Sequence, residues 1–154
     1  MQIRVAQVED IETLFEIRTS VRENRQSRVE LAQLGVTPRS IAHLLQTHSR
    51  AWIAETGDRA IGFALANAAE KTVFALFVLP EFEGRGTGRS LLQQAETWLW
   101  SHPNIEEIWL STTNNPALRA YGFYRHLGWI ATEASQKRIK FVKRKNRFTE
   151  QARQ

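Results

Sequence analysis

The chain has 154 residues, no cysteine and a formal net charge of +5, from 21 basic and 16 acidic side chains. A chain of this length is expected to form one domain with a core of its own. Without cysteine, a disulfide scaffold, a cysteine-ligated zinc site and a cysteine nucleophile are excluded. No apolar run approaches the roughly 18 residues of a membrane span. The N-terminus has early charges and no apolar signal core, so we expect a cytoplasmic protein without membrane partners.

The positive charge is concentrated near the C-terminus. Residues 137–154 hold eight basic side chains and one acidic side chain, which leaves 13 basic and 15 acidic for the rest. We therefore predict a near-neutral domain over residues 1–145 and a basic C-terminal tail over residues 146–154. The simpler interpretation is a last strand with a solvated basic end, and the alternative is contact with RNA or an acidic partner. No aromatic nucleic-acid motif accompanies the tail, so we do not expect nucleic acid as the main ligand.

Hydrophobic spacing predicts alternating strands and helices in the first half of the chain. A strand at residues 3–6 precedes a helix from about Asp10, and the stretch 22–28 is a polar break. Thr37 and Pro38 predict a helix start, with Thr as N-cap and Pro at the first helical position. Strands are expected at residues 51–55, 60–66 and 73–78. The last is an unbroken apolar run, which predicts a central strand buried on both faces.

The second half opens with a glycine-rich stretch and an amphipathic helix. Apolar positions from Leu91 to Leu99 follow helical spacing and stop before Pro103. A strand at residues 105–112 precedes a helix from Asn115 to about residue 127, which Gly128 closes. Late strands are expected at residues 129–131 and 138–142. This order predicts an α/β (α+β) three-layer domain, with helices flanking a mixed, largely antiparallel sheet.

A buried strand, a glycine loop and a helix N-terminus together favour anion binding. The first helical amides have no internal acceptor, and the helix dipole attracts negative charge. A Rossmann spacing fails, because its last glycine would fall on Arg89 or Leu91. A Walker loop fails because no lysine is present. The remaining pattern, Gly86-x-Gly88, is by itself also compatible with a tight turn that binds nothing.

Two blocks of sequence together resemble the GCN5-related N-acetyltransferase (GNAT) family. The first runs from residue 76 to 92, and the second, residues 119–129, has the pattern Ala-x-x-Phe-Tyr-x-x-x-Gly-aromatic. The resemblance implies acetyl-CoA as co-substrate, with the strand pairing with the pantetheine arm and the loop amides holding the pyrophosphate. The implied acetyl-CoA-binding residues are Leu76, Phe77, Val78, Gly84, Arg85, Gly86, Thr87, Gly88, Arg89 and Asn115. Glu83 departs from the family's Gln or Arg, and Ala117 from its Asn, for which Asn114 or Asn115 is expected to substitute.

The resemblance implies that an amine attacks acetyl-CoA directly. Such a transfer needs a neutral amine, a backbone N–H for the oxyanion and an acid for the departing thiolate. Tyr124 matches the family's catalytic tyrosine, and Tyr121, one turn earlier, is the rival candidate. No general base is assigned among Glu70, Thr72 and Glu23. Glu23 is predicted to lie at the acceptor site, or else to be a solvated or capping residue.

The remaining candidates carry weaker expectations. His43, His48 and His126 are expected at the surface, and the histidine spacing predicts no metal site. The tryptophans are expected in the core, with Trp109 the one placed to contact the acceptor. The acceptor is expected to be a small-molecule or peptide amine, and the near-neutral domain argues weakly against polyamines. The alternative function is a non-catalytic acyl-CoA-binding module, and the resemblance implies a homodimer.

Overall fold

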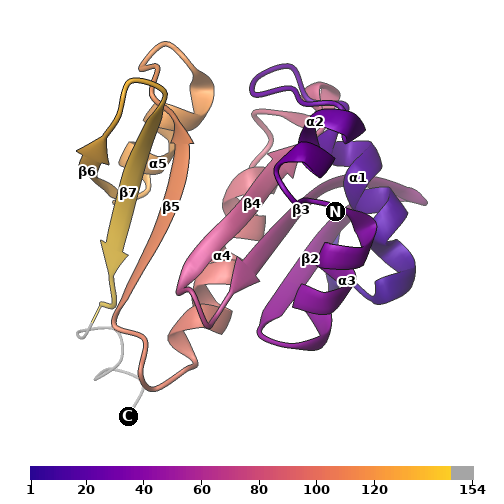
Figure 1. Ribbon diagram of the computed structural model, residues 1–154, viewed down its shortest axis with the longest axis horizontal. Helices are drawn as coiled ribbons and strands as arrows, with labels where there is room; N and C mark the ends of the chain where they lie inside the picture. The colour runs from indigo at the N-terminus through magenta and orange to yellow at the C-terminus, as the bar shows by residue number, and fades with distance from the viewer. Residues whose placement is uncertain (147–154) are drawn as a thin grey trace.

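The computed structural model describes residues 1–146, which form one seven-stranded sheet with helices on both faces (Figure 1). The strands are β1 (Gln2–Val5), β2 (Ser49–Thr56), β3 (Arg59–Asn67), β4 (Thr72–Val78), β5 (Glu107–Thr113), β6 (Ile130–Ala134) and β7 (Arg138–Arg144). The helices are α1 (Ile11–Arg18), α2 (Arg28–Gln33), α3 (Pro38–Gln46), α4 (Thr87–Trp100) and α5 (Arg119–His126), with 3-10 turns at Val8–Asp10 and Pro80–Phe82. The predicted fold class is confirmed. Most of the predicted basic tail, residues 147–154, lies outside the described residues.

The sheet opens between its fourth and fifth strands. The strand order is β1-β2-β3-β4-β5-β7-β6, and β4–β5 is the parallel pair in an otherwise antiparallel sheet. These two strands pair only through Thr72 and Trp109, and beyond that point they diverge (Figure 1). One edge of β4 therefore has no strand beside it from Phe74 to Val78.

This opening overturns the expectation that β4 is buried on both faces. Phe74 is 49% exposed, and residues 75–78 are only half-buried. The apolar run correctly placed the strand at the centre of the sheet order. Its burial was predicted wrongly: a long apolar run is typical of strands covered on both faces, but here the divergence of β5 leaves part of β4 open to solvent.

Two apolar cores lie on opposite faces of the sheet. Along β2, Trp52 and Ala54 belong to the core under α4, whereas Ala51 and Ile53 belong to the core under α1 and α3. This alternation is the period-two pattern of a strand covered on both faces. The predicted three-layer arrangement follows from it.

The helix starts test the capping arguments. Thr37 is the N-cap of α3 and accepts a hydrogen bond from the Ser40 amide at 3.1 Å, with Pro38 at the first position, as predicted. The helix α2 falls after the predicted polar break and was not expected. Its N-cap is Ser27, which forms a reciprocal capping box with Glu30.

The predicted start of α5 was wrong. The helix begins at Arg119, with Leu118 as N-cap, rather than at Asn115. The Asn115 side chain instead accepts a hydrogen bond from the Ala117 amide at 3.0 Å. This short turn satisfies the local backbone in a non-helical way, a known tendency of asparagine, and it delays the helix by one turn.

Basic side chains of β7 have partners within the domain. Lys143 pairs with Glu96 of α4 at 2.6 Å, Arg144 pairs with Glu107 of β5 at 3.2 Å, and the Lys140 ammonium lies 5.3 Å from the ring centroid of Trp109. Much of the C-terminal positive charge therefore belongs to a folded strand. Among the helices of residues 1–146, none is long and apolar enough to cross a membrane.

Candidate active site

A cavity of about 1100 Å³ lies where β4 and β5 diverge. Its walls come from the free edge of β4, the glycine loop, α1, the residues Glu23, Asn24 and Gln26, α5 and the beginning of β7. Elements far apart in the sequence thus meet because one strand lacks a partner. The cavity connects the two faces of the sheet, since both cores contribute lining residues.

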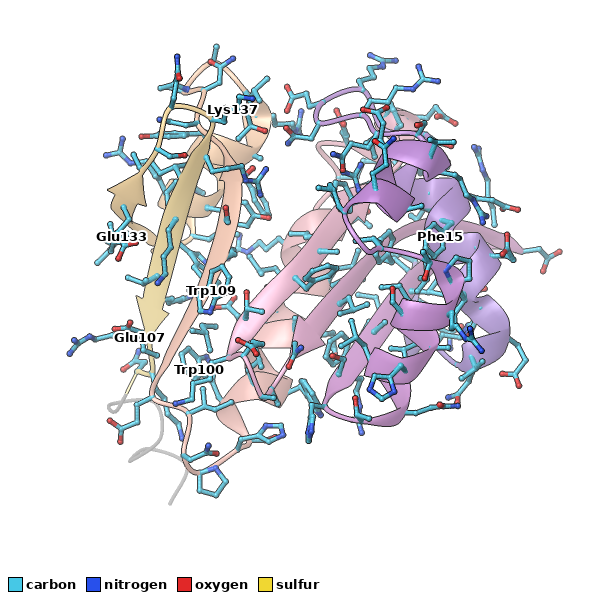
Figure 2. The ribbon with its side chains drawn as sticks, viewed as in Figure 1. Phe15, Trp100, Glu107, Trp109, Glu133 and Lys137 are labelled. Carbon is cyan, nitrogen blue, oxygen red and sulfur yellow. The ribbon has the colours of Figure 1, made fainter. Side chains whose placement is uncertain are left out.

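The strand pair at the base of the opening is fixed by side-chain hydrogen bonds. The Thr72 hydroxyl donates to the Trp109 carbonyl at 2.7 Å, and the Trp109 indole donates to the Glu70 carbonyl at 2.9 Å. Figure 2 shows Trp109 on β5 next to the beginning of β4. Thr72, Glu70 and Trp109 are not among the cavity-lining residues. The structure therefore gives no support to Glu70 or Thr72 as the base, or to Trp109 as an acceptor contact.

The segment after α1 spans the open end of the divergence. The Glu23 carboxylate accepts from the Arg119 amide at 3.1 and 3.3 Å, where α5 begins. The Asn24 side chain is hydrogen-bonded to Thr113 at the end of β5. Glu23 lines the cavity, and its place at an acceptor site stays a prediction. Its carboxylate caps a helix, so the capping interpretation describes its contacts.

Glycines shape the entrance to α4. Gly84 and Gly86 have φ of +76° and +83°, the left-handed region that side chains with a Cβ disfavour. Gly88 has ordinary φ, but a Cβ there would contact the Phe123 ring at 3.6 Å and Val78 at 3.7 Å. All three glycines line the cavity. The backbone therefore carries no side chain at these three positions, where the N-terminus of α4 meets the free edge of β4.

The first turn of α4 presents unpaired amides to this region. The Ser90 amide makes the first intrahelical bond, to the Gly86 carbonyl at 3.0 Å, so the amides before it have no acceptor in the helix. Arg89 lines the cavity, whereas the side chains of Arg85 and Thr87 do not: Arg85 lies over the Phe82 ring and Thr87 is buried. Thr87 can contribute its backbone N–H.

The strand residues singled out in the sequence all line the cavity, namely Leu76, Phe77 and Val78. The Leu79 amide donates to the Ile61 carbonyl of β3 at 2.8 Å. Because successive N–H groups of a strand point to opposite edges, the Val78 amide points to the free edge. A backbone donor is thus available at the cavity wall.

The two tyrosines of α5 have different surroundings. Tyr124 lines the cavity and is 8% exposed, with its ring centroid 5.3 Å from that of Phe123 and 5.9 Å from that of Phe141. Tyr121 also packs on Phe141, at 5.5 Å, but does not line the cavity. Burial raises the pKa of the Tyr124 phenol well above its ordinary value. The cavity wall therefore includes a tyrosine whose burial favours the protonated phenol.

Two further predictions concern residues near α5. Asn115 is exposed and does not line the cavity, since its side chain is used in the turn before the helix. His126 is exposed, as expected, yet it contributes to the cavity wall. Within residues 1–146, no cluster of His, Asp and Glu is arranged to hold a metal ion.

Two arginines in the cavity were not singled out from the sequence. Arg18 of α1 lies over the Phe77 ring, 4.2 Å from its centroid, and Arg138 of β7 donates to the Ser111 carbonyl at 2.9 Å. A sequence signal existed for Arg18. It falls on the apolar stripe of its helix, after Leu14 and Phe15, where a charge is unusual unless it has a function or a partner.

The free edge of β4 runs to a glycine-lined helix N-terminus, a geometry that suits an elongated ligand with an anionic group. The chain belongs to the acetyltransferase (GNAT) family, whose model matches residues 9–129. An uncharacterized N-acetyltransferase of Archaeoglobus fulgidus is 34% identical over 79 residues, a match that covers 45% of this chain and 54% of that protein. The matched stretch thus spans about half the length of the archaeal relative.

Solved structures share the fold at low sequence identity. The PaiA N-acetyltransferase of Thermoplasma acidophilum, solved with coenzyme A, has a TM-score of 0.76 at 17% identity, over 94% of this chain and all of that one. The ribosomal-protein-S18-alanine N-acetyltransferase of Escherichia coli has 0.71 at 14% identity, over 92% and 91%. A spermidine/spermine N-acetyltransferase of Vibrio cholerae has 0.64 at 12%, over 98% of both chains. Because these proteins are named for different acceptors, the fold alone does not select one.

Proposed function

We propose that the protein is an acetyl-CoA-dependent N-acetyltransferase that transfers the acetyl group to a primary amine by direct attack. The observation that carries the proposal is the free edge of β4, which ends at the unpaired amides of α4. Family membership supports it, and so does the coenzyme A complex of the Thermoplasma relative.

The cavity fits the chemistry of acetyl-CoA. Backbone groups along Leu76–Val78 suit the amides of a pantetheine arm, and the α4 amides with Arg89 suit a pyrophosphate. Gly88 leaves room beside Val78 for the two to join. Glu83, the departure from the family pattern, lies 3.9 Å from the Arg119 guanidinium, which offsets its repulsion of phosphate.

Acetyl-CoA supplies the thioester: the amine forms an N–C bond to the acetyl carbon, the C–S bond breaks, and CoA leaves as thiolate or thiol while the amine loses a proton. The Val78 amide, or a neighbour on the same edge, is placed to donate to the carbonyl oxygen as its charge grows. Such a donor needs no rearrangement, since the strand already holds it.

Tyr124 is proposed to assist the departing sulfur. Burial raises the pKa of its phenol and so keeps it protonated. With this raised pKa, the phenol is a weaker acid than the CoA thiol, whose pKa is about 8.5. Complete proton transfer to the sulfur is therefore uphill. Stabilisation of the developing thiolate by a hydrogen bond from the phenol is the role that this environment favours.

One observation favours the alternative, a non-catalytic acyl-CoA-binding module. The carboxylates that line the cavity are those of Glu23 and Glu83, and Arg119 contacts both. The backbone amide of Arg119 donates to Glu23, and the guanidinium of Arg119 pairs with Glu83. No free carboxylate base is therefore present among the lining residues. The enzyme reading then needs another acceptor for the amine proton, such as water, buffer or the imidazole of His126 in the cavity wall.

Release of CoA thiol in the presence of amines tests the proposal. The chain has no cysteine, so a thiol-reactive dye reports only the CoA that is formed. We expect release to depend on both acetyl-CoA and an amine, and mass spectrometry to find the acetylated product. Tight acetyl-CoA binding, measured by calorimetry, without release across small amines, amino acids and peptides would favour the binding module.

A further inference from the structure

The part of the cavity on the α1 face of the sheet is positively charged. Arg18 of α1 and Arg138, the first residue of β7, contribute this charge, and Lys137, directly before β7, also lines the cavity. Figure 2 shows Lys137 at the end of the β6–β7 hairpin. The cavity lining as a whole includes two carboxylates, those of Glu23 and Glu83, and both contact Arg119 instead of these basic residues.

This charge lies on the face away from the glycine loop. Arg18 lies over the ring of Phe77, which packs with the core under α1 and α3, whereas Gly88 is next to Val78, which packs with the core under α4. Consecutive strand residues point to opposite faces. The arginine therefore lies away from the amides that suit the pyrophosphate and beside the space left for the acceptor.

Both guanidinium groups have neutral partners only. Arg18 donates to the Asn24 carbonyl at 2.9 Å and to the Gln26 side-chain oxygen at 2.8 Å, and Arg138 donates to the Ser111 carbonyl and hydroxyl. Within residues 1–146, no carboxylate forms an ion pair with either arginine. Each guanidinium has five N–H donors, so several remain free to bind a ligand.

The environment makes an anion favourable at this position. Arg18 is half-buried, and its burial and then the nearby charge of Arg138 lower its pKa. A half-buried charge without a counterion is costly, and a planar guanidinium matches a carboxylate with two parallel hydrogen bonds. A carboxylate placed between α1 and β7 would supply a counterion for the half-buried Arg18 and would reduce its repulsion from Arg138.

We propose that the acceptor is an amine that carries a carboxylate, an amino acid in the simplest case, with the carboxylate held by Arg18 and Arg138. The inference rests on the proposed function and names its substrate class. Around Arg18, the lining side chains of α1, α2 and α3 are apolar: Leu14, Phe15, Leu31 and Ile41. Leucine is therefore a suitable probe, and polyamines are disfavoured.

Leucine and leucinamide form the test pair, with spermidine as a polycation. The amide's amine loses its proton more easily, so the comparison favours leucinamide unless the carboxylate is bound. We expect kcat/KM to be at least about tenfold higher for leucine, the scale of one charge-assisted contact. Arg18→Gln and Arg138→Gln should each remove most of this ratio, mainly through KM. Arg25→Gln, an exposed arginine outside the cavity lining, should preserve it.

Two results would overturn the inference while leaving acetyl transfer established. The first is a wild-type preference for leucinamide or spermidine over leucine. The second is an undiminished leucine-to-leucinamide ratio of kcat/KM in both arginine variants, provided that both melt at the wild-type temperature. If no amine is acetylated, the proposed function fails instead. The anion site is then still decided by calorimetry on the CoA-loaded protein. N-acetyl-leucine should bind at least about tenfold more tightly than N-acetyl-leucinamide, and equal affinities would refute the site.

Discussion

Replacing Tyr124 with phenylalanine tests the chemistry most directly. The change removes one hydroxyl and keeps a ring that packs against Phe123, Trp129 and Phe141. A hydrogen bond to a charged group contributes about 1.5–3 kcal/mol, and about 1.36 kcal/mol corresponds to a tenfold change in rate. We therefore expect Tyr124→Phe to lower kcat about 10- to 100-fold, with the dissociation constant of acetyl-CoA little changed.

Tyr121→Phe is the matched control. It removes the same atom from the same helix, on a ring that also packs on Phe141 but lies outside the cavity lining. Thiol release should stay within about twofold of wild type, the range of small surface effects. Equal losses in the two variants would point to a packing effect. An unchanged kcat in Tyr124→Phe would remove the phenol from the mechanism.

The environment of Tyr124 also predicts a pH dependence. Because burial raises the pKa of the phenol above its ordinary value of 10.0, the phenol stays protonated over the working range. The wild-type kcat should therefore show no decline from phenol ionisation up to pH 10. A falling limb below pH 10 that disappears in Tyr124→Phe would show that the phenol ionises earlier and contradict this environment.

Three further changes test the cavity and its supports. Gly88→Ala adds a methyl group at ordinary contact distance, so the fold should persist. Calorimetry should show acetyl-CoA binding weakened about tenfold, the scale of overpacking. The control Gly122→Ala places its methyl group in open space and should leave acetyl-CoA binding intact. Glu23→Ala removes a helix-capping carboxylate and should cost about 1 kcal/mol in denaturant unfolding; no loss would refute the cap. Hydrogen bonds from Arg4 lower the pKa of Asp10 below its ordinary value of 3.8. The ion pair therefore stabilises the fold above pH 3.8, and this stabilisation is lost as the pH falls through the lowered pKa. In Asp10→Asn, the melting temperature should fall less between neutral and acid pH than in the wild type.

The features that could be predicted from the sequence were local ones. Capping chemistry placed the start of α3, and the glycine spacing with the following apolar stripe placed α4 and the glycine-rich turn before it. The start of α2 was missed although its signal was present: Ser27, followed three residues later by Glu30, is a capping box. The start of α5 was misplaced because the Asn115 side chain closes a short turn with the Ala117 amide instead of capping a helix.

What the sequence did not predict depends on contacts between distant segments. The role of Glu23 as a cap for α5 requires residues 96 positions apart to meet. Arg18 interrupts an apolar stripe, but its surroundings are set by Phe77 and by residues of β7. A one-dimensional pattern indicates that such a charge is unusual, and only the folded chain shows that it faces a cavity.

The open edge of β4 raises a stability question that the supports of the cavity answer. An apolar strand with unpaired backbone groups is prone to pair with another chain. Here the edge is enclosed, because Thr72 fixes β4 to β5 at the base and the Glu23–Asn24 segment ties α1 to α5 and β5 at the open end. These contacts connect the two halves of the sheet at both ends of the opening. Under the proposed function, acetyl-CoA would satisfy the same backbone groups that a second chain could otherwise pair with.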